Sequence, residues 1–418
     1  MLFPVRSELE ELRIDSDRLM GRIEELAAVG AIEGTQGCSR LALTDEDKTG
    51  RDLVKAWMAD LGLEITIDGI GNVVGVMSGR TDGAPVMCGS HIDTVATGGR
   101  YDGNLGVLAG LEVIETVMAA GITPDRGLAV GYFTDEEGAR FPPDMLGSLV
   151  YVGGMSLEHA LDIVGIDGAR VGNELERIGY DGSSPLPGMV PHAFVELHIE
   201  QGPVLEAEQV TIGAVEGVQG ISWQKATVTG QSNHAGTTPI GLRRDPGLVA
   251  ARCVAFVREI ANDLGHPQVA TVGRLDLVPN LVNVVPASAT FTVDLRNTDE
   301  GILQKAEAMF ADFLASAAAE ENCTVETETL ARFEPVVFDA SVVDIVERSA
   351  KRLGHSVRRM PSGAGHDAQM LARVCPTAMI FTQSRDGLSH NPREFTEVAD
   401  LVAGTNVLCQ TMLQLATD

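Results

Sequence analysis

Short apolar runs alternate with long helical patterns between residues 44 and 138, and this alternation limits the chain to a few folds. A helix is predicted over residues 44–62, because Thr44 can cap its start and Gly62 can end it. The elements that follow are strands at 64–68, 71–79 and 84–93, a helix at 104–121 and a buried strand at 127–138. Strands that alternate with helices predict an α/β layered fold.

The pattern changes at about residue 213. A strand, a helix, two strands, a helix and a last strand are predicted at residues 221–231, 245–265, 268–278, 288–297, 300–322 and 324–333. This order matches the ferredoxin-like split unit. We therefore expect an α+β domain over residues 213–330, inserted into a larger α/β domain that is built from residues 1–212 and 331–418.

Length and composition set broad limits on the kind of protein. A chain of 418 residues is too long for one compact core, so two domains are expected. No stretch approaches the roughly 18 unbroken apolar residues that a membrane helix needs. Residues 1–19 contain no apolar core of a secretory signal, and the six cysteines form no C-x-x-C pair. These features predict a cytoplasmic protein with reduced thiols.

The formal net charge of −28 opposes binding to nucleic acid and to anionic membranes, so neither partner is expected. The charge does not by itself indicate a cationic ligand. A well-solvated acidic surface explains it, because net charge bears first on solubility.

The stretch GSHIDTVATGGRYDG, residues 89–103, carries the first candidate site residues. Side chains two apart on a strand point the same way, so Asp93 could accept a hydrogen bond from one imidazole nitrogen of His91 and leave the other nitrogen for a metal. The glycine-rich turn could bring Asp102 back to the same point. Alone, these residues also fit a capping aspartate beside an ordinary histidine.

Two adjacent glutamates, Glu136 and Glu137, follow the apolar run at 127–133. Buried carboxylates are costly unless they are paired or bound to metal. Where the chain turns at a strand end, one glutamate can bind a cation while the other faces the water beside it. The alternative is a solvated acidic turn.

Two further motifs carry candidate ligands. An apolar strand carries His198 and is followed by Glu200 and Gln201, and His390 lies in a predicted loop. In open α/β sheets, ligands bind beyond the carboxyl ends of the strands. Histidines and carboxylates without thiolates suit zinc, manganese, cobalt or nickel.

Motifs for other reactions are absent or incomplete. The sequence has no G-x-S-x-G and no H-E-x-x-H motif. The run GAGHDA, which contains His366, lacks a clear preceding strand and lacks an acidic residue at the distance that a dinucleotide-binding loop requires.

The motifs from GNVVG through SHNP together resemble the amidase, hydantoinase and carbamoylase family of dinuclear metallohydrolases. That family includes N-carbamoyl-L-amino-acid hydrolase, allantoate amidohydrolase and β-ureidopropionase. The resemblance covers nearly the whole chain, and the motifs occur in the family's order. It implies hydrolysis of the carbamoyl C–N bond of N-carbamoyl-L-amino acids, which gives the L-amino acid, carbon dioxide and ammonia, with two divalent metal ions per chain.

The resemblance implies a metal role for five residues. Asp102 matches the carboxylate that bridges the two metal ions. His91 and His198 would complete one metal site, and Glu137 and His390 the other.

Catalytic and substrate-binding roles are implied in the same way. Asp93 would orient His91, Glu136 would be the general base, and His234 would help to stabilise the oxyanion. The positions that match substrate-binding residues are Gln201, His234, Asn283, Arg296 and Gly365. A guanidinium suits a substrate carboxylate, although Arg296 alone also fits a surface strand arginine.

The smaller domain is implied to be a lid and dimerisation domain, so a homodimer is expected, with His234 acting within its own chain or across the dimer. Allantoate and N-carbamoyl-β-alanine remain alternative substrates, because both carry a carbamoyl-type group and a carboxylate. A non-catalytic metal-dependent binding protein on the same fold is a further alternative. Glu136 argues against it, because a binding site has no need for this second carboxylate.

Overall fold

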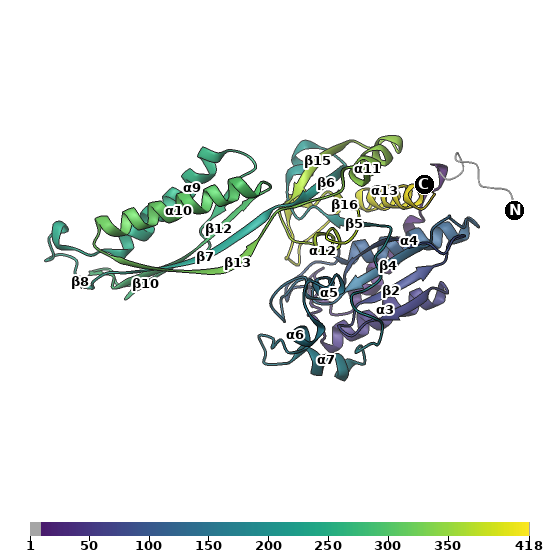
Figure 1. Ribbon diagram of the computed structural model, residues 1–418, viewed down its shortest axis with the longest axis horizontal. Helices are drawn as coiled ribbons and strands as arrows, with labels where there is room; N and C mark the ends of the chain where they lie inside the picture. Colours follow the sequence, from purple (N-terminus) through teal and green to yellow (C-terminus); the bar gives the residue numbers. More distant parts are fainter. Residues whose placement is uncertain (1–9, 418) are drawn as a thin grey trace. The chain divides into compact units, whose positions relative to one another are not determined.

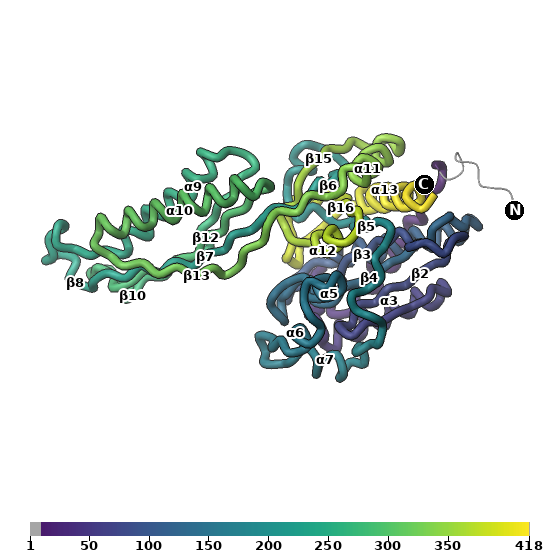
Figure 2. Tube along the Cα trace, viewed as in Figure 1, coloured from purple at the N-terminus to yellow at the C-terminus, as the bar shows by residue number. Residues whose placement is uncertain are grey.

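The computed structural model describes residues 10–417 and divides into two compact units. Unit 1 contains Met1–Glu216 and Val337–Asp418, and unit 2 contains Gly217–Val336. In Figure 2 the purple and yellow parts of the trace lie in unit 1, and a green segment between them forms unit 2. Unit 2 is therefore a continuous insertion into unit 1.

Unit 2 begins at residue 217 rather than 213 and ends at residue 336 rather than 330. Strand β6 (Ile212–Val218) pairs through its first four residues with β16 (Thr377–Thr382) in the large sheet. At the other end, β13 (Thr324–Phe333) pairs with β7 (Gly220–Thr229) as far as its last residue. Both strands run past the points at which the sequence pattern changes.

A nine-stranded mixed sheet forms the centre of unit 1 (Figure 1), with the strand order β1-β2-β4-β3-β5-β16-β6-β14 and with β15 paired to β6. Its remaining strands are β1 (Glu64–Ile67), β2 (Val73–Met77), β3 (Val86–His91), β4 (Leu128–Phe133), β5 (Ala193–Ile199), β14 (Val336–Val337) and β15 (Val357–Ser362). Strands β3, β4, β5 and β16 run parallel to their neighbours in this group. Their carboxyl ends therefore meet at one edge of the sheet.

Helices cover both faces of this sheet. Arg51 on α3 (Asp45–Asp60) lies over the ring of Tyr132 on β4, whereas the adjacent Phe133 contacts Tyr151 on α5 (Leu146–Tyr151). Adjacent strand residues point to opposite faces, so α3 and α5 lie on different sides. The other helices of unit 1 are α2 (Ser16–Ala28), α4 (Asn104–Ala119), α6 (Leu157–Leu161), α7 (Val171–Ile178), α8 (Val204–Glu208), α11 (Ala340–Arg352), α12 (Asp367–Leu371) and α13 (Val398–Thr417). The predicted α/β layered fold is confirmed.

Unit 2 is an antiparallel sheet with two long helices, which lie side by side in Figure 1. The helices α9 (Pro246–Leu264) and α10 (Glu300–Glu320) pack on strands β7, β12 and β13 around a core that includes Cys253, Phe291 and Phe310. The strand order is β10-β12-β7-β13, with β9 also on β12. The bounds are β9 (Val269–Thr271), β10 (Leu275–Val278) and β12 (Ser288–Asn297).

One predicted strand of unit 2 is divided. Residues 268–278 form the two short strands β9 and β10, and Gly273 lies between them. Glycine weakens a strand interior because it has no side chain to pack. Strands β8 (Asn233–His234) and β11 (Val284–Val285) form a separate two-stranded sheet.

Within residues 10–417, no helix is both long and apolar enough to cross a bilayer. All six cysteines lie in this part of the chain and are unpaired. The prediction about a secretory signal at residues 1–19 falls partly on residues 1–9, which lie outside the described residues.

Candidate metal centre

The candidate ligands lie at the carboxyl ends of the parallel strands. His91 is the last residue of β3, His198 is next to last in β5, and Glu136 and Glu137 follow β4. His390 comes from the loop after β16. The parallel arrangement brings segments that are far apart in the sequence to one edge of the sheet, where ligands bind in open α/β folds.

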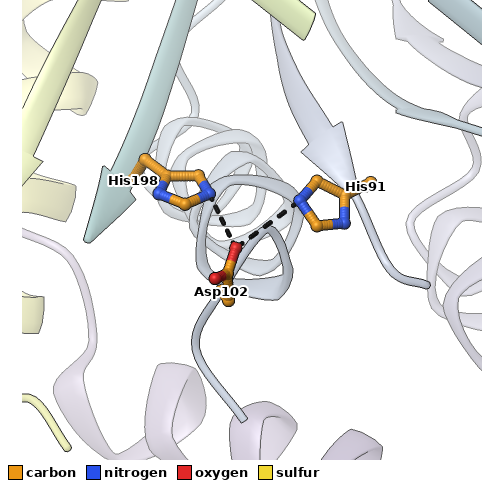
Figure 3. A group of neighbouring side chains, drawn as sticks. All are labelled: His91, Asp102 and His198. Atoms are coloured by element: carbon orange, nitrogen blue, oxygen red, sulfur yellow. Dashed lines mark ion pairs between the residues drawn. The ribbon is translucent and has the colours of Figure 1, made fainter. Parts of the chain in front are cut away.

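The first ligand group consists of His91, Asp102 and His198 (Figure 3). Asp102 Oδ1 lies between the two rings, 3.2 Å from His198 Nε2 and 3.7 Å from His91 Nε2. All three side chains are buried. Among the described residues, His91 Nε2 has no hydrogen-bond partner, which leaves its lone pair free to bind a cation.

The second ligand group consists of Asp102, Glu137 and His390. His390 Nε2 lies 3.2 Å from Glu137 Oε2 and 3.6 Å from Asp102 Oδ2. Asp102 therefore offers one oxygen to each group, as a carboxylate shared by two metals would do. The side chain of His390 is 52% exposed, so this group is open to solvent.

The electrostatics of the pocket fit a bound cation. Burial, together with the Asp367 and Glu137 carboxylates, raises the pKa of Glu136 well above its usual range. Burial also raises the pKa of Glu137, although His390 opposes this, and burial lowers the pKa of His91. Each shift disfavours the charged form of a carboxylate or an imidazole. Neutral imidazoles and ionised carboxylates are the forms that bind zinc, manganese, cobalt or nickel, and such an ion would supply the missing positive charge.

His91 is oriented by the backbone. Its Nδ1 lies 2.9 Å from the backbone carbonyl oxygen of Asp93 and 4.0 Å from the Asp93 carboxylate. The prediction that the Asp93 side chain accepts this hydrogen bond is wrong, because β3 ends at His91 and strand alternation does not extend to residue 93. The Asp93 carboxylate instead accepts hydrogen bonds from the backbone N–H groups of Glu136 and Glu137, at 3.4 and 3.3 Å.

Three side chains hold Asp102 in place. The Glu394 carboxylate accepts hydrogen bonds from the backbone N–H groups of Tyr101 and Asp102, at 3.0 and 3.2 Å. Burial and the nearby Asp102 raise the pKa of Glu394 to about 8. Ser389 Oγ donates to Asp102 Oδ2 at 2.5 Å, and Gln201 Nε2 donates to the same oxygen at 2.7 Å.

Sequence reasoning missed Glu394 and Ser389. The only signal was their place in SHNPREF, beside the predicted ligand His390. Gln201 was predicted to bind substrate, and the structure places it against Asp102.

Gly103 permits the close approach of the two ligand segments. Its φ of 66° lies in the left-handed region, and a Cβ built there would meet His91 Nε2 at 2.3 Å. Its backbone N–H also donates to His198 Nε2 at 3.1 Å. Any side chain at this position would therefore displace a ligand.

Replacing Gly103 with alanine should weaken metal binding by at least about 10-fold, because His91 must move. Isothermal titration with cobalt(II) measures this loss. Gly62→Ala is the matched control, since Gly62 has a φ of 69° and nothing within 4 Å of a Cβ. The control should lose only about 1 kcal/mol of stability. Equal metal affinity in both variants would contradict the assignment of His91.

The segment before α12 holds the predicted substrate-binding residue Gly365 and, next to it, His366. Gly365 packs against Met145, because a Cβ at Gly365 would meet the Met145 methyl group at 2.9 Å. His366 lies 4.5 Å from His198 between ring centroids and shares a hydrogen bond with Ser362. Neither residue belongs to the two ligand groups that share Asp102. A third possible group joins Glu196 with His198 and His366.

The third group is already satisfied by hydrogen bonds. Ser90 donates to one carboxylate oxygen of Glu196 at 2.6 Å, and the backbone N–H of Ala368 donates to the other at 2.7 Å. We therefore assign no ion to it.

Three predicted residues lie in unit 2. His234 is exposed, and its Nδ1 accepts hydrogen bonds from Gly236 and Thr237. Asn283 is close to it, because the Asn283 carbonyl oxygen accepts a hydrogen bond from Ala235. These contacts place His234 and Asn283 in one small patch.

Arg296 lies elsewhere in unit 2. It pairs with Asp294, and its guanidinium carbon is 5.8 Å from the ring centre of Trp223. Asn283 precedes β12, which starts at Ser288. The eight residue-to-residue steps from Ser288 to Arg296 span about 27 Å of strand. Unit 2 therefore does not bring Arg296 to the His234 patch.

Known proteins share both the sequence and the fold of this chain. Residues 87–414 match peptidase family M20/M25/M40. The chain belongs to this family. Family members are metal-dependent hydrolases, so the chain is a hydrolase that acts on C–N bonds.

M20 relatives align over almost the whole chain. An N-carbamoyl-L-amino-acid amidohydrolase from Rhizobium meliloti is 39% identical over 409 residues, which cover 97% of this chain and 98% of the relative. An allantoate amidohydrolase from Escherichia coli strain K12 is 36% identical over 394 residues, 94% of this chain and 96% of the relative. A crystal structure of an amidase of the hydantoinase/carbamoylase family from Burkholderia multivorans has a TM-score of 0.95 at 44% identity and covers 97% and 99% of the two chains. The family predicted from the motifs is confirmed.

Proposed function

We propose that this M20 hydrolase releases L-amino acids from N-carbamoyl-L-amino acids, with carbon dioxide and ammonia as the other products. The observation that carries the proposal is the shared Asp102, which faces one ligand group through each of its carboxylate oxygens. The relatives named as N-carbamoyl-L-amino-acid amidohydrolases support the choice of substrate. We further propose a cytoplasmic location, which the unpaired cysteines support.

In the proposed reaction, His91, His198 and Asp102 would hold one divalent ion, and Glu137, His390 and Asp102 would hold a second. When bound, two such ions would supply an acidified water molecule and polarise the carbonyl group under attack. Glu136 is the general base: it takes a proton from the attacking water and passes it to the leaving nitrogen. Its Oε2 lies 3.4 Å from His91 Nε2, beside the first group.

Asp93 supports this chemistry without touching the reacting atoms. Its carboxylate accepts hydrogen bonds from the backbone N–H groups of Glu136 and Glu137. These bonds fix the backbone that carries the proposed base, Glu136, and the proposed metal ligand, Glu137. Gly365 and Gln201 line the substrate pocket in this proposal, although Gln201 must then contact substrate and Asp102 together.

We propose that the active enzyme is a homodimer in which two subunits complete each site. Arg296 would bind the substrate carboxylate in a forked pair, and His234 and Asn283 would face the carbamoyl oxygen. The separation of Arg296 from the His234 patch supports contributions from two chains. Light scattering gives the mass of the active species, and a fully active monomer would contradict shared sites.

Assays against a substrate panel test the activity. N-Carbamoyl-L-amino acids should be hydrolysed with a kcat/KM about 100-fold above that for allantoate or N-carbamoyl-β-alanine, because the side-chain pocket discriminates among them. The N-carbamoyl-D-amino acid is the matched control and should be inert. Activity on allantoate alone would replace the proposal with the allantoate alternative, which the Escherichia coli relative favours.

A further inference from the structure

Arg40 is a fully buried cation behind the candidate metal centre. It lies between α2 and α3 and donates only to uncharged groups. Nη1 donates to the carbonyl oxygens of Leu26 and Val29 at 3.1 and 2.7 Å and to Cys38 Sγ at 3.2 Å. Among the described residues, every acceptor that its guanidinium reaches is a backbone carbonyl oxygen, a thiol or a side-chain amide oxygen, and none is a carboxylate. A buried charge without a counter-ion is costly, so its contacts need an explanation.

The remaining donors of Arg40 reach both ends of the loop that joins two proposed ligands. Nε donates to the carbonyl oxygen of Ile92 at 2.7 Å, directly after His91. Nη2 donates to Asn104 Oδ1 at 2.6 Å, and Asn104 Nδ2 donates to the carbonyl oxygen of Asp102 at 3.1 Å. One rigid guanidinium therefore spans the start and the end of the loop.

The backbone around Arg40 is paired with the middle of the same loop. Cys38 and Gly98 exchange two backbone hydrogen bonds, at 3.0 and 3.1 Å. Thr94 N–H donates to the Arg40 carbonyl oxygen at 2.9 Å, and Arg40 N–H donates to Thr94 Oγ1 at 2.7 Å. The loop is thus wrapped around residues 38–40.

We propose that Arg40 is a positioning residue that sets the separation of His91 and Asp102, and so the affinity of the first ligand group for its ion. Arg40 touches neither substrate nor reacting atoms, and it acts through Ile92 and Asn104. Its planar fork fixes two acceptors at once, which a single ammonium group cannot do in the same geometry. The inference rests on the metal role that we propose for His91 and Asp102.

Titration with cobalt(II) tests this inference without any measurement of activity. Arg40→Met and Arg40→Lys should bind cobalt(II) about 10- to 100-fold more weakly than the unmodified protein. The visible absorption of bound cobalt should also change, because it reports the ligand geometry. Asn104→Ala removes one end of the bridge and should shift both measurements in the same direction, which keeps the test informative if the Arg40 variants fold poorly.

Arg18→Met is the matched control. Arg18 also joins α2 to α4, through two hydrogen bonds to Glu112 at 2.7 and 2.6 Å. Its loss should lower the melting temperature and leave cobalt affinity and spectrum unchanged. The inference is overturned if Arg40→Met lowers only the melting temperature, or if Arg40→Lys binds cobalt normally. If the unmodified protein binds cobalt but hydrolyses no carbamoyl substrate, the proposed function fails and the titration still decides the role of Arg40.

Discussion

Glu136→Gln should lower kcat by about 10²- to 10⁴-fold while the protein keeps its metal content. Glutamine preserves the shape of the side chain but cannot take a proton from water. Among the described residues, Glu136 belongs to neither of the two candidate ligand groups that share Asp102. Replacing its carboxylate with an amide should therefore not cause loss of a metal ion. Steady-state kinetics and metal analysis of the same preparation measure the two quantities.

The adjacent glutamate provides a matched control. Glu137 faces His390 at 3.2 Å and belongs to the second ligand group. Glu137→Gln should therefore lower the metal content, whereas Glu136→Gln should not. Normal turnover by Glu136→Gln would show that another group is the base.

Removal of the metal ions should abolish activity and destabilise unit 1. Without a cation, Glu136 and Glu137 lie close to each other and to the Asp102 carboxylate, and burial raises the pKa of both glutamates, which disfavours their charged forms. A ligand present at 100 times its Kd stabilises the folded state by about 2.7 kcal/mol. Dialysis against a chelator, followed by thermal unfolding and by separate addition of zinc, manganese, cobalt and nickel, measures both effects.

Asp102→Ala serves as the control for this experiment. The variant lacks the oxygen atoms that both ligand groups share, so the chelator should not change its melting temperature. Retained activity in the unmodified protein after complete removal of metal would contradict the proposed mechanism.

Much of the fold could be predicted from the sequence, because helices and strands produce regular spacings of apolar residues. The helix expected at 104–121 is α4 (Asn104–Ala119), and the buried run before the glutamates is β4. The candidate ligands His91 and His198 were predicted because each lies at or next to the end of an apolar strand, and the carboxyl ends of parallel strands converge.

Other contacts of the site depend on the folded chain and could not be predicted from a local sequence pattern. Glu394 contacts the backbone of Tyr101, more than 290 residues away, and only the folded chain brings them together. The hydrogen bond from His91 Nδ1 to the backbone carbonyl oxygen of Asp93 depends on where β3 ends, to within one residue. The position of Arg40 depends on the packing of α2 and of the segment from Ile92 to Asn104, which no periodic pattern describes.

The insertion of unit 2 also determines the order in which a ribosome can complete the structure. All strands of the unit 2 sheet lie within residues 220–333, so the nascent chain can close this sheet as soon as it is made. Strand β16, which separates β5 from β6 in the large sheet, is synthesised only afterwards, as are His390 and Glu394. Until then, the nascent chain holds His91, Asp102 and His198 beside an unpaired β5 edge. Unit 1 thus depends on late, long-range pairing, which slows folding and exposes strand edges to aggregation.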